Sequence, residues 1–266
     1  MGAPAPILDD TIHNNQGTQT MTNTLTGKIA LVTGGSRGIG AAIVRRLAKD
    51  GATVAFTFAA SSERAAGLAA EIEADGGLCL AVNADSADPA AVKAAVAQIV
   101  ERFGRIDILV NNAGILLRGM VDDYDLALFD RMIAVNVRAV FVAIQAAIAR
   151  MGEGGRIITI GSVTADRAGF PGASVYGMTK GAVAALTRGL ARDLGPRGIT
   201  VNAVQPGPTE SDMNLDENIR ALVRPLIALG RMGKGTEIAS LVAYLAGPES
   251  SFVTGAALTI DGGYLA

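Results

Sequence analysis

The sequence predicts an α/β fold built on a parallel sheet that helices cover on both faces. Short apolar runs alternate about six times with longer segments of helical period, and this order requires crossover connections between parallel strands. The apolar runs carry few polar residues, as strands buried on both faces do. No linker rich in proline, serine or charge divides the 266 residues, so we expect one domain.

The elements follow one another from Lys28 onward. Strands are expected over residues 29–33, 53–57, 78–82, 106–110, 156–160, 200–204 and 257–260. Helices are expected over residues 39–49, 62–74, 89–103, 126–150, 175–194 and 236–246. The connection 205–232 breaks this rhythm and contains Pro206, Pro208 and Pro225. A connection of that length is typical of a lid over a binding site.

The composition excludes several classes of function. The 23 basic and 25 acidic residues give a net charge of −2, without the basic excess of a nucleic-acid binder. One cysteine, Cys79, excludes a disulfide within the chain and a cysteine-based zinc site, and it suits a reducing cytoplasm. One histidine, His13, excludes a multi-histidine metal site and a Ser-His-Asp relay, so no metal site is expected.

No membrane or export segment is expected. The longest apolar stretches, 139–144 and 182–186, are far shorter than the roughly 18 residues of a spanning helix. Residues 1–24 are polar and lack the basic start and apolar core of a secretory signal. We therefore expect an N-terminal tail or extension over 1–24, one domain over 25–266 with a substrate lid over about 205–232, and a cytoplasmic location.

A glycine-rich turn joins the first strand to the first helix. It reads Gly34-Gly35-Ser36-Arg37-Gly38-Ile39-Gly40. Glycines let a phosphate approach the backbone, and the N-terminus of the following helix supplies N–H groups and partial positive charge. The turn therefore predicts dinucleotide binding. It also matches the G-x-S-x-G nucleophile elbow of hydrolases, but that site needs a later histidine, and none follows His13.

The end of the second strand favours NADP over NAD. An acid at this place would bind the ribose hydroxyls of NAD and repel the extra phosphate of NADP. The sequence there carries Phe58, Ala59 and Ser61, with no acid before Glu63. Arg37 in the glycine turn can face the phosphate, and Ser61 can add a hydroxyl.

A set of motifs resembles the short-chain dehydrogenase/reductase family from about residue 25 to the C-terminus. The motifs are Thr33-Gly34-x-x-x-Gly38-x-Gly40, Asn111-Asn112-Ala113-Gly114, Ser162, Tyr176-x-x-x-Lys180 and Pro206-Gly207, in the family's order. The resemblance implies a single Rossmann-type, doubly wound domain with a seven-stranded parallel sheet. It also implies metal-free hydride transfer between NAD(P) and a carbonyl or alcohol, and a homotetramer.

Tyr176 is the candidate acid and base. Its ordinary pKa near about 10 is too high for work at neutral pH, and we expect the ammonium of Lys180, one helical turn later, to lower it. Ser162 follows a strand, where its hydroxyl can donate to the substrate oxygen. The resemblance adds that Lys180 holds the nicotinamide ribose and that Asn136 holds a water beside the lysine. Taken alone, each residue also fits a structural role, and Tyr-x-x-x-Lys is common on helices.

The resemblance implies further cofactor contacts after the later strands. Asp85 and Ser86 would meet the adenine, although Asp85 also fits a helix cap before Pro89. Asn112, Ala113 and Gly114 would pack on the cofactor, whereas Asn111 is expected to tie neighbouring strands together. Pro206 and Gly207 would lie against the nicotinamide, and Thr209 or Ser211 would add a hydroxyl.

The expected substrate pocket is mostly apolar, with Leu116, Phe170 and Met213 as candidate walls. It favours a small hydrophobic ketone or secondary alcohol. The alternative of a 3-oxoacyl-acyl-carrier-protein reductase needs a basic landing patch. Arg192 matches one arginine of that branch, but Val142 stands where the second would be.

A regulatory role is the alternative from another class. Residues 165–167, 189–209 and 252–255 resemble a bacterial family member linked to cyclic-dinucleotide binding, and Arg167 could meet a phosphate. The intact catalytic positions favour the enzyme. Charged residues are 18% of the chain, and the helices over 126–148 and 175–194 are apolar on more than one side. Both observations favour a homotetramer.

Overall fold

Seven parallel strands form one sheet in the computed structural model, which describes residues 24–210 and 217–266. The strands are β1 (Ile29–Val32), β2 (Thr53–Phe58), β3 (Cys79–Asn83), β4 (Ile108–Asn111), β5 (Arg156–Ile160), β6 (Thr200–Pro206) and β7 (Ala257–Ile260). Their order is β3-β2-β1-β4-β5-β6-β7. The chain therefore winds outward from β1 in two directions, and the predicted doubly wound fold is confirmed.

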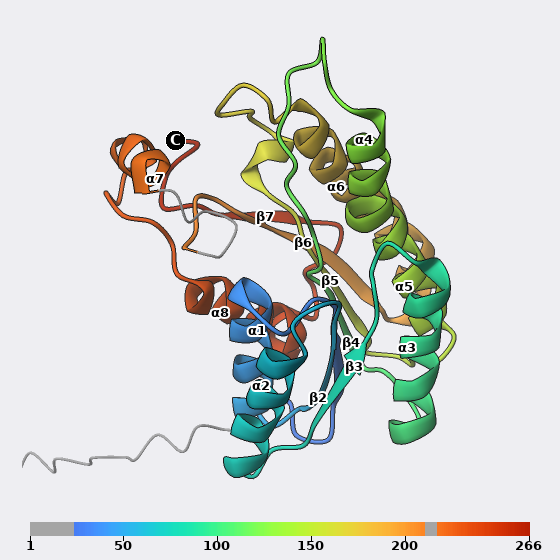
Figure 1. Cartoon of the computed structure of the whole chain (residues 1–266). Helices are drawn as coiled ribbons and strands as arrows, with labels where there is room; N and C mark the ends of the chain where they lie inside the picture. Colours follow the sequence, from blue (N-terminus) through green and yellow to red (C-terminus); the bar gives the residue numbers. More distant parts are fainter. Residues whose placement is uncertain (1–23, 211–216) are drawn as a thin grey trace, which may run out of the picture.

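Helices cover both faces of this sheet (Figure 1). The helices α1 (Gly38–Lys49), α2 (Ser62–Ala74) and α8 (Gly235–Ala246) lie on one face. The helices α3 (Pro89–Phe103), α4 (Leu126–Ile133), α5 (Ala139–Ile148) and α6 (Ser174–Leu194) lie on the other. Each layer has its own apolar cluster against the strands. This is the arrangement that mostly apolar strands require.

The segment 126–150, which we predicted as one helix, contains a π-helical turn at Ala134–Arg138 between α4 and α5. A π turn adds one residue to a helical turn. A periodicity averaged over 25 positions does not reveal one inserted residue, so the sequence analysis missed it. The turn carries Asn136.

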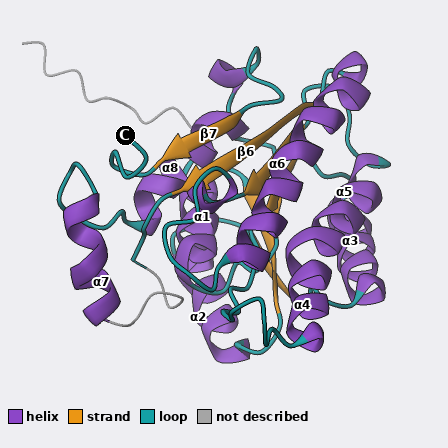
Figure 2. Ribbon diagram, turned by 90° about the horizontal axis from the view of Figure 1, so that it is seen from above, coloured by secondary structure: helices purple, strands orange, loops and turns teal. Residues whose placement is uncertain are grey.

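The connection after β6 is more ordered than predicted. The strand continues to Pro206, and a short helix, α7 (Glu217–Val223), follows with a 3-10 turn at Arg224–Leu226. Figure 2 shows that α7 stands to one side of the sheet, near the end of the chain. Ile219 and Val223 of α7 belong to the third apolar cluster, together with Ile227, Met232 and, from the final segment, Tyr264 and Leu265.

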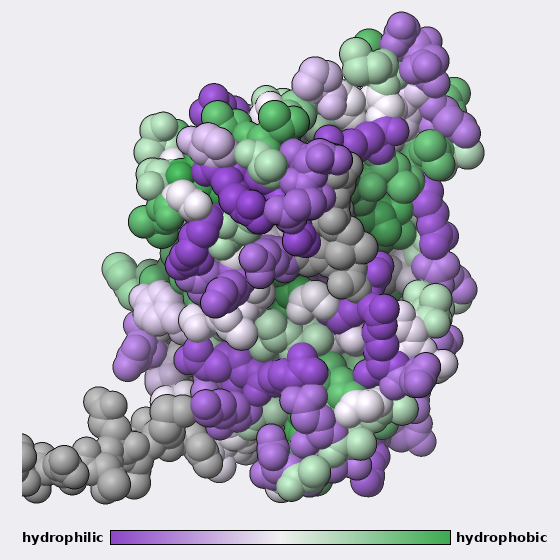
Figure 3. Space-filling model, turned by 60° about the vertical axis from the view of Figure 1, so that its left-hand side comes forward, coloured by the Kyte–Doolittle hydropathy of each residue, from purple (hydrophilic) through white to green (hydrophobic). Residues whose placement is uncertain are grey.

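One side of the molecule has hydrophilic side chains over most of its lower part, whereas hydrophobic side chains gather in its upper part (Figure 3). An exposed salt bridge joins Arg45 of α1 to Glu71, and a half-buried one joins Arg46 of α1 to Asp50. Among the described residues, no helix has both the length and the apolar character needed to cross a membrane. The expected tail lies outside the described residues, apart from Thr24.

Candidate active site

A cavity of about 280 Å³ opens at the carboxyl ends of the strands. Its walls come from the glycine turn after β1, the loops after β4, β5 and β6, the start of α6 and the lid. Sixteen of the predicted site residues line it: Gly34, Arg37, Gly38, Ile39, Gly40, Asn112, Ala113, Gly114, Leu116, Ser162, Phe170, Tyr176, Lys180, Pro206, Gly207 and Thr209. The fold thus brings most of the predicted cofactor and catalytic residues into one site.

The glycine turn is shaped for a diphosphate. Gly34 and Gly38 adopt φ values of +66° and +54°, which favour glycine. A Cβ atom at Gly40 would overlap the carbonyl oxygen of Gly34 and the side-chain amide of Asn112. Helix α1 begins directly after Arg37, whose side chain makes no capping hydrogen bond within the described residues. The first N–H groups of α1 therefore remain available for an anion, and this geometry fits a dinucleotide.

Thr33 joins the glycine turn to the loop after β4. Its hydroxyl accepts N–H groups from Asn112 (3.0 Å) and Ala113 (3.1 Å). The Asn112 amide donates in turn to the carbonyls of Thr33 (3.0 Å) and Gly34 (2.9 Å). The sequence analysis used Thr33 only as part of a motif and missed this role, which a hydroxyl residue directly before the glycines could have indicated.

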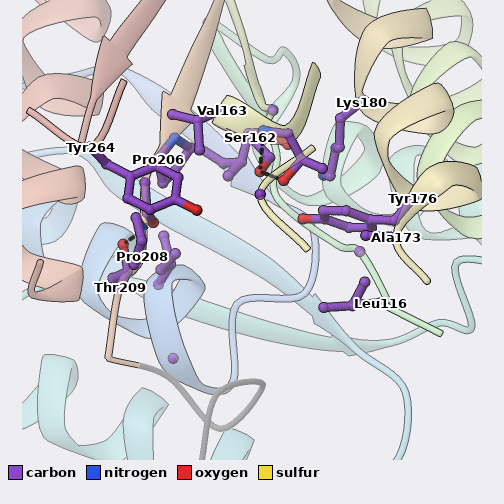
Figure 4. Close-up of a pocket in the computed structure, with 18 of the residues that line it drawn as sticks. Leu116, Ser162, Val163, Ala173, Tyr176, Lys180, Pro206, Pro208, Thr209 and Tyr264 are labelled. Atoms are coloured by element: carbon purple, nitrogen blue, oxygen red, sulfur yellow. Dashed lines mark hydrogen bonds between the residues drawn. The ribbon is translucent and has the colours of Figure 1, made fainter. Parts of the chain in front are cut away.

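Three of the four catalytic candidates, Ser162, Tyr176 and Lys180, come from neighbouring elements. Ser162 follows β5; its hydroxyl accepts the Thr164 N–H (3.1 Å) and shares a hydrogen bond with the Thr164 hydroxyl (2.9 Å). Tyr176 lies in the first turn of α6, and Lys180 follows one turn later with its Nζ 5.6 Å from the centre of the Tyr176 ring. Figure 4 shows the Tyr176 hydroxyl pointing into the cavity.

Burial has the largest effect on the pKa values of Tyr176 and Lys180. Burial raises the pKa of Tyr176, and the nearby Ser162 hydroxyl offsets part of this rise. The Nζ of Lys180 instead donates to the Ile160 carbonyl (2.8 Å), and burial lowers the pKa of Lys180 to about 8. In the protein without cofactor, burial thus disfavours the charged form of both groups, and the lowering of the tyrosine pKa by Lys180 stays a prediction.

Asn136 lies behind the cavity, in the π turn. Its Oδ1 accepts the Ile115 N–H (2.9 Å), and its Nδ2 donates to the Ile115 carbonyl (2.9 Å) and the Thr179 hydroxyl (3.1 Å). The amide thus fixes the loop after β4 against α6. The backbone of Gly114 lies between Asn136 and the Lys180 amine, since a Cβ there would be 3.5 Å from each. The water predicted for Asn136 stays a prediction.

The adenine-side candidates lie outside the main cavity. Ser36 lines a neighbouring open hollow together with Arg37 and Arg64. Phe58 ends β2, the Ala59 carbonyl accepts the Asn83 amide (2.9 Å), and Ser61 is the N-cap residue of α2. These residues lie at the sheet edge where the adenine end of a dinucleotide would extend.

Asp85 forms a turn by accepting the Ala87 N–H (2.8 Å) and pairs with Arg131 (3.2 Å). Its pKa is lowered mainly by that N–H bond and further by Arg131. The helix cap before Pro89 is Asp88, not Asp85. Ser86 lines a small pocket beside the sheet.

Asn111 donates to the Thr159 hydroxyl of β5 (3.5 Å), so its predicted role between strands is confirmed. Thr209 is buried and donates to the Gly207 carbonyl (2.9 Å). Met213 and Ser211 lie outside the described residues. The sequence analysis did not predict Tyr264 in the site, although it lines the cavity.

The fold and the Ser162-Tyr176-Lys180 site define a Rossmann-type oxidoreductase that works with a dinucleotide. The family model described as enoyl-(acyl carrier protein) reductase matches residues 34–265. The chain belongs to the short-chain dehydrogenase/reductase family, as its motifs predict.

Three bacterial proteins are similar over nearly their whole length. The cyclic-di-GMP-binding biofilm dispersal mediator protein of Escherichia coli is 48% identical over 240 residues, which are 90% of this chain and 98% of that protein. A short-chain dehydrogenase/reductase from Serratia marcescens is 56% identical, with a TM-score of 0.89, over 91% of this chain and 100% of its own. A short-chain dehydrogenase from Burkholderia cenocepacia, solved in complex with NADP, is 54% identical with a TM-score of 0.90 over the same shares.

Proposed function

We propose that the protein is an NADP-dependent oxidoreductase that reduces the carbonyl of a small, mostly hydrophobic ketone, or oxidises the secondary alcohol in reverse. The observation that carries this proposal is that Ser162, Tyr176 and Lys180 share one cavity with the glycine turn. Bound NADPH would supply a hydride to the carbonyl carbon. The protein itself must bind the ketone, orient it and provide a proton to its oxygen.

Tyr176 is suited to the proton-donor role. Burial raises its pKa, so the phenol is protonated at neutral pH. The Ser162 hydroxyl can donate to the same substrate oxygen and hold it beside Tyr176. Lys180 is positioned to bind the ribose of the cofactor, and its amine is held by the Ile160 carbonyl.

The charge pattern supports NADP as the cofactor. Arg37 is exposed at the glycine turn and lines both the main cavity and the hollow toward the adenine side. No carboxylate occupies the end of β2, which closes with Phe58. The solved Burkholderia cenocepacia relative, whose complex contains NADP, adds support by similarity.

Apolar side chains form much of the remaining cavity wall, beside the arginines at its rim. Leu116, Phe170, Ile219, Val223 and Met232 line the part beyond the catalytic residues. These five side chains favour a hydrophobic ketone over a sugar, because they give no hydrogen bonds to replace those that a sugar makes with water.

The test is NADPH oxidation with a panel of small ketones, followed by absorbance. We expect wild-type turnover and a loss of about 10²- to 10⁴-fold in Tyr176→Phe, which removes the proton donor and little packing. Tyr244→Phe removes a phenol hydroxyl from α8, outside the cavity, and should keep full activity. Wild-type protein that binds NADPH but reduces no ketone would exclude the proposed reaction.

Cyclic-dinucleotide binding is the second candidate function. Arg118, Arg167 and Arg220 all line the cavity and give it positive charge. The Escherichia coli relative has this ligand in its name. Calorimetric titration with cyclic di-GMP, with and without saturating NADPH, tests this function. The role is supported if cyclic di-GMP binds in either condition and Arg167→Ala weakens that binding. The absence of binding heat in both conditions would reject it.

The acyl-carrier-protein alternative is less favoured. Arg192 is exposed on α6, but Val142, where the branch carries its second arginine, is buried in α5. The landing patch for an acidic carrier would thus lack half of its charge.

We also propose a homotetramer that works in the cytoplasm, without nucleic-acid or membrane partners. The support is an apolar outer surface on the helices that carry the site. Phe141 of α5 and Met178 of α6 are 47% and 46% exposed. Large apolar side chains on such helices are typical of subunit interfaces.

A further inference from the structure

The segment that follows β7 brings a second phenol to the active site. After β7, the Asp261 carboxylate accepts the N–H groups of Gly263 (2.9 Å) and Leu265 (2.9 Å), and Gly262 and Gly263 adopt positive φ values. This tight turn directs Tyr264 back toward the cavity. Its ring belongs to the apolar cluster that also contains Val163, Val223, Ile227 and Met232.

The Tyr264 hydroxyl faces the cavity and not the apolar cluster. The residue is 8% exposed and lines the cavity. Figure 4 shows its hydroxyl and that of Tyr176 pointing toward one another from opposite sides. This hydroxyl forms no hydrogen bond with any of the residues that the structure describes. The hydroxyl is open to the cavity, so a molecule bound there can be its hydrogen-bond partner.

Gly169 makes this position of the phenol possible. A Cβ at residue 169 would overlap the Tyr264 hydroxyl oxygen. The φ of Gly169 lies outside the positive range, so the backbone there does not itself require glycine. The missing side chain instead leaves room for the tip of Tyr264, and Gly169 also lines the cavity.

We propose that the Tyr264 hydroxyl binds a second oxygen group of the substrate. The preferred substrates are then ketones that carry another carbonyl or hydroxyl, and not simple monoketones. The reacting oxygen lies with Ser162 and Tyr176, and the second oxygen meets Tyr264 on the opposite side of the cavity. A phenol can donate to a carbonyl and can also accept from a hydroxyl. This inference rests on the proposed ketone reduction.

A series with one carbon skeleton tests the proposal. We would measure kcat/KM with NADPH for 2-hexanone, 2,3-hexanedione and 2,5-hexanedione in the wild type, in Tyr264→Phe and in Tyr244→Phe as the control. We expect the wild type to prefer at least one dione. Tyr264→Phe should reduce that preference, measured as the ratio of kcat/KM for the dione to kcat/KM for 2-hexanone, about five- to tenfold, which is the usual effect of one neutral hydrogen bond. Tyr244→Phe should leave the ratio unchanged.

Gly169→Ala is an independent second variant. It leaves the phenol in the chain but displaces its hydroxyl, so it should lower the dione preference in the same direction. The proposal is overturned if ketones are reduced and the ratio of dione to monoketone is the same in the wild type and Tyr264→Phe. An equal loss for 2-hexanone and the diones would assign Tyr264 a packing role and also overturn it. If the wild type reduces no ketone at all, the proposed function itself fails, which is a distinct result.

Discussion

Arg37 and Lys180 are two cationic side chains at different parts of the site, and they have different tasks. Arg37 is exposed at the glycine turn, whereas Lys180 is buried beside Tyr176. An exposed guanidinium keeps its charge and can bind a phosphate on arrival. A buried amine loses part of its charge until an anionic or polar partner comes close. We therefore predict an effect on cofactor preference for Arg37 and an effect on pH-dependent stability for Lys180.

We expect Arg37→Ala to weaken NADPH much more than NADH. The variant removes the charge that we propose binds the 2′-phosphate, and a charge-assisted hydrogen bond is worth about 1.5–3 kcal/mol, roughly 10- to 150-fold in KM. Steady-state rates with both cofactors measure the change, and Arg37→Lys should retain part of the preference. Equal efficiency of the wild type with NADPH and NADH would contradict the cofactor assignment.

We expect Lys180→Met to change how stability depends on pH. The pKa of Lys180 is about 8 in the folded protein and about 10.5 in an unfolded chain. Between these values the unfolded chain binds more protons, so the wild type gains stability as pH rises. From pH 7 to pH 9.5 the gain relative to Lys180→Met should be about 2 kcal/mol.

Urea unfolding of the cofactor-free proteins at the two pH values measures this difference. If the free energy of unfolding changes equally with pH in the wild type and in Lys180→Met, Lys180 is not desolvated in the folded protein. The variant should also lack turnover, which separates its effect on stability from its effect on catalysis.

At the scale of elements, the loop after β4 depends on the residue before the glycine turn. The Thr33 hydroxyl accepts N–H groups from Asn112 and Ala113. Thr33→Val keeps the shape but leaves two N–H groups without this partner, so we expect a loss of about 1–2 kcal/mol in the free energy of unfolding and weaker NADPH binding. Denaturant unfolding and a fluorescence titration measure both effects.

Thr33→Ser is the matched control, because it keeps the hydroxyl and removes only a methyl group. It should bind NADPH as the wild type does. If Thr33→Val also binds NADPH normally, the two hydrogen bonds do not position the loop.

The strands and most helices could be predicted because burial on both faces leaves continuous apolar runs, and helices keep one apolar stripe. The interior of the site was harder to predict. Asn136 contacts residues 21 and 43 positions away, and nothing local to it reveals those partners. Tyr264 was missed because its place depends on the turn held by Asp261. Helix α7 was missed because prolines flank it, and proline usually marks a loop.

At the scale of the whole molecule, we expect a homotetramer. Light scattering at micromolar concentration should give a mass about four times the 27.1 kDa of one chain. Phe141→Arg places a charge on the exposed apolar side of α5 and should lower the mass, because an unpaired charge in an interface is costly. Leu78→Arg, an equally drastic change at the β3 edge, should leave the mass unchanged. A mass near one chain for the wild type would refute the assembly.

The contact between α1 and α8 joins two distant parts of the chain. These helices pack side by side, and Arg46 donates to the Ser240 hydroxyl (2.9 Å), 194 positions later. Synthesis proceeds at about 5–20 residues per second, so α8 is made roughly 10–40 s after α1. The apolar face of α1 has no α8 to pack against during that time. A nascent chain that has not yet produced α8 exposes part of the core that β1 and β2 share. Chaperone binding to the growing polypeptide should thus concentrate on its first third and end when residues 235–246 have left the ribosome.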